Sequence, residues 1–152
     1  AYYWVSIFLR GDFMDYKRFD KKIVLRLKKG DKIIESLEKL ANEENITGAH
    51  FQGIGAVNEL KIGILHPGDD DYQWDTYNED LEITSLIGNI TIFDQKPIVH
   101  THITCAGEGS KVIGGHLGEA TCSFTAEIFI DLIDGKLEKQ ADTDLGINII
   151  EF

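Results

Sequence analysis

Alternation of apolar and polar residues is the dominant pattern in this chain. From Ala120 to Leu132 every second residue is apolar, and the residues between them are mostly polar, which is the pattern of a strand with one buried face. Ile23, Leu25 and Leu27 alternate in the same way. Strand-like runs bounded by turn-forming residues predict further strands. These are residues 2–9, 49–55, 60–65, 72–77, 81–93, 98–106 and 147–152.

One segment has helical spacing instead. Ile33, Leu37, Leu40 and Ala41 recur three or four residues apart, which predicts a helix over about residues 31–45, with Asp31 as its N-cap. The predicted fold is therefore α+β, with a largely antiparallel β-sheet and one principal helix. Because no linker, repeat or low-complexity tract interrupts the chain, we expect residues 1–152 to form a single domain.

Three of the five histidines fall within seventeen residues: His100, His102 and His116. Alternate side chains of a strand project from one face, so His100 and His102 stand side by side. His116 follows Gly114 and Gly115, which lack a Cβ and permit a sharp turn or a close backbone approach. Three neutral imidazoles at roughly 2.0–2.1 Å suit zinc and leave a fourth position for water. Spacing alone also fits a partly exposed histidine pair that binds no metal.

Several other polar residues are candidates for supporting roles at the predicted metal site. Glu82 and Asn89 are candidates to orient an imidazole or to hold a bound water. A carboxylate beside a metal-bound water would be needed for hydrolysis, and spacing does not single out Glu119 or Glu127 for that role. Cys105, near a glycine-rich turn, is expected to be more accessible than a thiol on the apolar face of a strand.

Charge limits the partners that we expect. The chain has 15 Lys and Arg against 26 Asp and Glu, a net charge of −11, which as a whole repels phosphate backbones. Nine of the 15 basic residues nevertheless lie within residues 10–32. We call these nine the basic cluster, which would serve DNA binding or subunit pairing only if it forms a positive patch, while a solvated face is its simpler interpretation.

The two cysteines form no CxxC motif and no dense disulfide framework, so a reduced, cytoplasmic setting is expected. The apolar run at residues 2–9 is too short to span a bilayer and lacks the basic flank and cleavage site of a signal peptide. We therefore expect no membrane association. A removed segment upstream of Ala1 stays an open alternative.

Several ordered motifs together resemble the plants-and-prokaryotes-conserved (PPC) domain family, over nearly the whole chain. Each motif is weak alone, but their order and spacing are specific. They are FQGIGAV at 51–57, LEITSLIGNI at 81–90, HTH at 100–102, GGHL at 114–117, AT at 120–121 and TAE at 125–127. The resemblance is to the prokaryotic single-domain branch, whereas plant members carry the domain next to AT-hooks.

The resemblance implies an α+β fold around an antiparallel sheet, a homotrimer, and the histidine cluster as a metal site. It also implies an association with AT-rich DNA, but the chain contains no Arg-Gly-Arg-Pro hook, so nucleic-acid binding by the isolated chain is not expected. Three interpretations stay open. They are a trimeric zinc-binding module with a regulatory role, a zinc-dependent hydrolase acting on a small molecule, and a DNA-associated transcriptional regulator.

Overall fold

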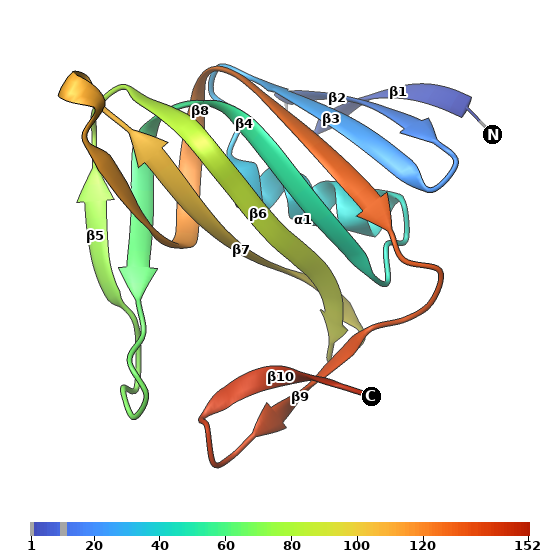
Figure 1. Ribbon diagram of the computed structural model, residues 1–152. Coiled ribbons are helices and arrows are strands. Elements are labelled where there is room, and N and C mark those ends of the chain that lie inside the picture. The colour runs from blue at the N-terminus through green and yellow to red at the C-terminus, as the bar shows by residue number, and fades with distance from the viewer. Residues whose placement is uncertain (1, 10–11) are drawn as a thin grey trace.

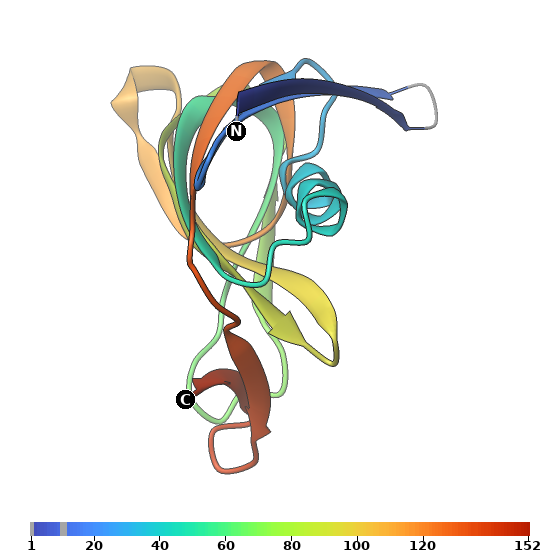
Figure 2. The same cartoon turned by 90° about the vertical axis from the view of Figure 1, so that its right-hand side faces the viewer.

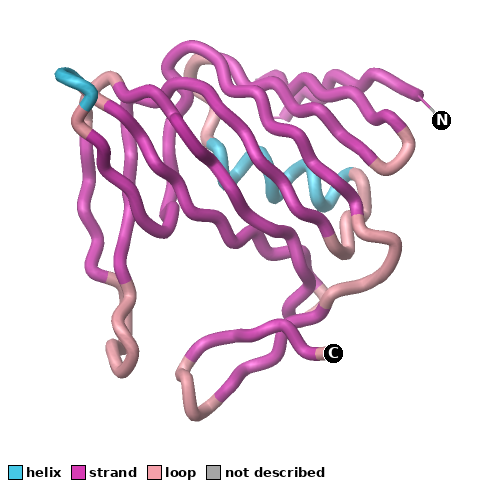
Figure 3. The backbone as a smooth tube through the Cα atoms, viewed as in Figure 1, coloured by secondary structure: helices cyan, strands magenta, loops and turns pink. Residues whose placement is uncertain are grey.

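The computed structural model describes residues 2–9 and 12–152, and most of this part of the chain is β-strand (Figures 1 and 3). One α-helix and one short 3-10 turn accompany the strands. The strands are β1 (Tyr2–Leu9), β2 (Asp12–Phe19), β3 (Lys22–Lys28), β4 (Ala49–Ile64), β5 (Gln73–Tyr77), β6 (Leu81–Phe93), β7 (Lys96–Ala106), β8 (Val112–Leu132), β9 (Glu138–Asp142) and β10 (Ile147–Glu151). The helix is α1 (Ile33–Glu43), and the 3-10 turn is η1 (Glu108–Ser110).

All strands join one sheet in the order β1-β2-β3-β8-β4-β6-β9-β10, with β5 paired to β4 and with β7 paired to both β6 and β8. Every pairing is antiparallel except that of β6 with β9, where Ile92 lies beside Glu138. The sheet is therefore mixed, and the fold is more β-dominated than the predicted α+β class implies.

Four strands close on themselves. β4 pairs with β6 and β8, and β7 pairs with the same two strands, so β4, β6, β7 and β8 curve into the ring seen in Figure 2. Register shifts in β4 between Gly53 and Gly55 and again between Gly55 and Val57 are β-bulges, which increase strand bending. The curvature separates an inner face, which holds the core, from an outer face.

The inner face is filled by apolar side chains that approach zero exposure, among them Phe51, Leu86 and Ile103. Helix α1 packs against β7 and β8 and contributes Ile33, Leu37, Leu40 and Ala41 to the core. Burying a side chain of this size stabilises a fold by about 1.5–3 kcal/mol. The core therefore fixes which residues of each strand point outward.

Helix α1 is shorter than predicted, and the Asp31 N-cap prediction is wrong. The N-cap residue is Lys32, which makes no side-chain capping bond, and Asp31 instead accepts a hydrogen bond from the Lys28 amide at 2.9 Å. The cap comes from β8, because Glu119 accepts from the amides of Ile34 at 2.8 Å and Glu35 at 3.2 Å. A carboxylate here satisfies exposed amides and complements the positive end of the helix dipole.

Most predicted strands are confirmed, with two main differences in extent. The segments predicted at 49–55 and 60–65 form the single strand β4, and β8 begins at Val112 rather than near residue 120. Strands β2 and β9 were not predicted. In the described part of the chain, no helix has both the length and the apolar character needed to cross a membrane.

Candidate metal centre

The three predicted histidines meet on the outer face. His102 of β7 lies directly across from His116 of β8, and cross-strand partners share a face. His100 stands two residues earlier on β7, while Thr101 and Ile103 between and beyond them are buried at 2% exposure. The predicted face assignment of β7 is thus confirmed, and the sheet brings the imidazoles of two strands together.

Glycines permit the close packing that this convergence needs. A Cβ on Gly114 would stand 2.8 Å from the carbonyl oxygen of Ile103, and one on Gly115 would stand 2.9 Å from that of Gly63. Both distances are shorter than real Cβ contacts allow. Of the two predicted roles, the close backbone approach is therefore the one that the structure supports, since both glycines lie within β8.

The geometry of the cluster is close to that of a metal site. One nitrogen from each of the three imidazoles can be chosen so that all three lie within 4.8 Å of one another. Ring centroids are 5.3 Å apart for His100 and His102, 5.3 Å for His100 and His116, and 5.8 Å for His102 and His116. Tetrahedral zinc would place nitrogens roughly 3.4 Å apart. The nitrogens would have to approach one another by up to about 1.4 Å, from 4.8 Å, to reach that spacing.

The environment keeps two of the imidazoles neutral. Burial is the main cause that lowers the pKa of His100, to about 4, and the charges of Lys139, His116 and His102 lower it further. Burial also lowers the pKa of His116, with contributions from His102 and Lys139. Neutral imidazole is the form that binds metal ions. In addition, Nδ1 of His116 is buried without a hydrogen-bond partner in the described part of the chain.

Aromatic side chains line one side of the cluster. The Tyr72 ring stacks on the His116 ring with centroids 4.4 Å apart, and the Trp74 ring lies 4.9 Å from Tyr72. Trp74 of β5 pairs across the sheet with Gly63, where an added Cβ would stand 2.8 Å from the indole. No sequence pattern signals these two aromatics, because the pairing of β5 with β4 places them there.

On the other side, a groove of about 510 Å³ reaches His100 and His102. Asn89 lines this groove, lies directly across from His100, and has a buried Oδ1 without a partner in the described residues. Asn89 therefore lies beside the cluster, and its predicted role in orienting an imidazole or holding a bound water stays a prediction. His50, which is not among the predicted site residues, also lines the groove and lies across from Asn89 on β4.

Other candidates lie away from the cluster. Glu82 pairs with Ala106 at the far end of β7, and the carboxylate of Glu119 caps α1. No carboxylate belongs to the three-histidine group in the described residues.

Cys105 is fully buried on the inner face, so the expectation that it is accessible is wrong. Burial raises the pKa of its thiol to about 11.

Lys139 also lies near the histidine cluster, and the sequence analysis did not predict this position. It lies on β9 in the C-terminal hairpin, is half-buried, and its positive charge is close enough to lower the pKa of His100 and His116. Burial lowers the pKa of Lys139 itself. No pattern in the sequence connects this residue to the histidines, since only the folding of the hairpin against β6 places it there.

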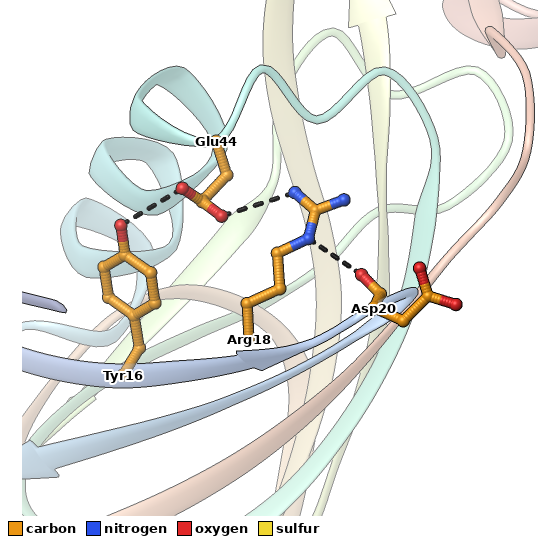
Figure 4. Close-up of polar contacts among 4 residues, drawn as sticks. All are labelled: Tyr16, Arg18, Asp20 and Glu44. Carbon is orange, nitrogen blue, oxygen red and sulfur yellow. Dashed lines mark hydrogen bonds and ion pairs between the residues drawn. The ribbon is translucent and has the colours of Figure 1, made fainter. Parts of the chain in front are cut away.

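Four of the eight described residues of the basic cluster form ion pairs with acidic groups of the same chain. Figure 4 shows Arg18, whose Nη1 donates to Oε1 of Glu44 at 3.3 Å and whose Nε donates to the Asp20 carbonyl at 2.8 Å, while Tyr16 also donates to Glu44. Arg10 lies outside the described residues. Three further pairs are Arg26 with Asp15, Lys21 with Asp134 and Lys22 with Asp131.

These observations define a class: a mostly β domain with a mixed sheet, one helix and a three-histidine cluster on its outer face. The chain belongs to the Plants and Prokaryotes Conserved (PCC) domain family, whose family profile matches residues 14–134. This is the family, also abbreviated PPC, that the sequence motifs resemble, and that prediction is confirmed. No curated protein matches the chain.

Solved structures of similar proteins agree with the assignment. A candidate DNA-binding protein from Bacteroides thetaiotaomicron is 27% identical, with a TM-score of 0.88 over 91% of this chain and 97% of that one. A metal-containing protein from Archaeoglobus fulgidus is 32% identical, with a TM-score of 0.81 over 89% and 96%. A plant- and prokaryote-conserved (PPC) protein from Pyrococcus horikoshii is 29% identical, with a TM-score of 0.80 over 95% and 98%.

Proposed function

We propose that this chain is a metal-binding domain protein in which His100, His102 and His116 hold one divalent ion, with zinc as the best fit. The convergence of three imidazoles, with ligand nitrogens within 4.8 Å, carries the proposal. An all-nitrogen donor set suits zinc, and three protein ligands leave one coordination position for water or another molecule. The description of the Archaeoglobus relative as metal-containing supports the same conclusion.

The experiment is a metal analysis of purified protein and of two variants. The wild type should carry about one zinc per chain after zinc loading and desalting, and His102→Ala should lose most of it because two imidazoles bind an ion far more weakly. His66→Ala, which removes a histidine from a turn outside the cluster, should keep full stoichiometry. Full metal retention by His102→Ala would remove the proposed site.

We further propose that the protein is a homotrimer. The family resemblance supports this state, and so do exposed apolar side chains on the outer face: Ile54 is 60% exposed, Ile87 52% and Phe129 52%. These three residues line one groove of about 260 Å³, and we call them the apolar patch. We propose that a second copy of the chain occupies this groove. In the resulting assembly the ion would organise the interface, and the assembly would have a regulatory role.

DNA association is the second candidate function, and the description of the Bacteroides relative favours it. Against it stand the net charge of −11 and the ion pairs that occupy several cations of the basic cluster. Non-specific DNA binding needs cations that can replace counterions on the phosphates. We therefore place it behind metal binding, and salt-dependent binding to duplex DNA would be its minimum support.

A zinc-dependent hydrolase is the third candidate. An open coordination position is compatible with it, but the described residues place no carboxylate in the histidine group as a general base. The proposal therefore extends to metal binding and not to a reaction.

A further inference from the structure

We infer that the metal centre and Lys139 together bind a small molecule through an oxyanion, either a carboxylate or a phosphate group. The inference rests on the proposed metal centre and adds to it the class of ligand that fills the open coordination position. It combines the location of Lys139, the charge of the site and the groove beside it.

The C-terminal hairpin brings Lys139 to the cluster. Strand β9 runs parallel to β6 where Ile92 lies beside Glu138, and the Ile92 amide donates to the Leu137 carbonyl at 2.8 Å. Lys139 is half-buried, and while its backbone pairs with Ile150 of β10, its ammonium makes no hydrogen bond or ion pair with another described residue. Lys136 in the same hairpin differs, because its ammonium pairs with Glu138 at 2.7 Å.

The positive charge of the metal-loaded site favours an anionic ligand. Three neutral imidazoles leave the charge of a divalent ion uncompensated, and the described residues add no carboxylate to the group. Lys139 raises the local positive charge further. Partly buried charges are costly unless they are paired, so an oxyanion that contacts the ion and the ammonium would neutralise both. Such charge-assisted hydrogen bonds are roughly twice as strong as neutral ones.

The surroundings favour a small organic molecule as the carrier of that anion. The groove of about 510 Å³ leads to His100 and His102. In this groove Oδ1 of Asn89 is buried without a partner among the described residues, and it can accept a hydrogen bond from a donor group elsewhere on the ligand. Tyr72 and Trp74 form an aromatic wall at His116. The family profile ends at residue 134, so Lys139 lies in a part of the chain that this profile does not cover.

The test uses cobalt(II) in place of zinc, because the visible spectrum of cobalt reports changes in its coordination. Metal stoichiometry is measured first for the full-length wild type, Lys139→Gln, Lys139→Arg and the control Lys136→Gln. Each loaded protein is then titrated with acetate and, separately, with inorganic phosphate. Tighter binding of one probe than of the other identifies which oxyanion the site prefers.

We expect all four proteins to bind cobalt equally and the wild type to bind one or both anions. Lys139→Gln should weaken anion binding by about tenfold or more, Lys139→Arg should retain most of the affinity, and Lys136→Gln should match the wild type. Equal anion affinity in wild type and Lys139→Gln, with normal cobalt uptake, would overturn this inference alone. Absence of cobalt uptake by the wild type would overturn the metal centre and this inference together.

Discussion

At the scale of single residues, the two cysteines should be inert in the folded protein. Burial raises the pKa of Cys105 to about 11 and also raises the pKa of Cys122. At pH 8 a thiol with a pKa of 11 is only about one part in a thousand thiolate, and the thiolate is the reactive form. We therefore expect no reaction with a disulfide reagent such as Ellman's reagent at pH 8, and two thiols per chain after denaturation.

Rapid modification of the native protein would contradict this burial, and Cys122→Ser and Cys105→Ser would identify the thiol responsible. The result bears on function because cysteine is a strong zinc ligand. Cys105 follows His102 by three residues but faces the core, so the proposed centre contains histidine alone.

Residue spacing predicted that the three histidines lie together, because the strand period fixes the face of the sheet on which each side chain lies. His100 and His102 required only this local rule. The approach of His116 depends on the pairing of β7 with β8, for which Gly114 and Gly115 gave a partial signal. Tyr72 and Lys139 gave none, because their places depend on how β5 and β9 join the sheet. Local patterns do not encode such long-range pairings.

At the scale of elements, helix α1 should depend on a cap from a distant strand. Glu119→Ala removes the carboxylate that accepts from the amides of Ile34 and Glu35. Loss of a cap costs about 0.5–2 kcal/mol, and for a domain of this size each kcal/mol lowers Tm by about 2–4 °C. We expect thermal unfolding to show a decrease of a few degrees for Glu119→Ala.

Glu43→Ala provides the control, because Glu43 is exposed in the last turn of the same helix. An acidic residue there does not complement the helix dipole, so its removal should leave Tm unchanged or slightly raise it. An unchanged Tm for Glu119→Ala would show that Glu119 does not stabilise the helix N-terminus.

The same cap explains why one element boundary was mispredicted. Asp31 follows Gly30 and precedes the helical spacing, which is a typical N-cap context, but its carboxylate closes the turn after β3 and β8 supplies the cap. Strand β4 illustrates the opposite case. Residues 49–55 and 60–65 were correctly predicted as strand, and the segment between them, which contains the polar residues Asn58 and Glu59, continues the same strand through register shifts.

At the scale of the whole molecule, we predict a trimer. Sedimentation equilibrium should give about three times the chain mass of 17.1 kDa. Phe129→Glu places a charge in the apolar patch and should shift the mass towards that of the monomer, because an unpaired charge is costly to bury in an interface. Leu145→Glu changes an exposed apolar residue outside the patch and should leave the mass unchanged. A wild-type monomer would exclude the trimer.

Fold class and family were largely predictable at this scale. Strand alternation predicted a sheet, helical spacing predicted one helix, and the order of several weak motifs predicted the family. The mixed character of the sheet was not predictable, because it arises from the single parallel contact between Ile92 and Glu138 in a hairpin that depends on tertiary packing. That hairpin also carries Lys139, so the ligand class inferred for the site became visible only in the folded chain.

Binding of one divalent ion by His100, His102 and His116 is tested most directly by a crystal structure with anomalous diffraction collected on both sides of the zinc absorption edge. We expect one anomalous peak per chain within roughly 2.0–2.1 Å of a nitrogen from each of the three imidazoles. A fully occupied ion held by other residues, or no peak at the cluster in crystals grown from zinc-loaded protein, would contradict it.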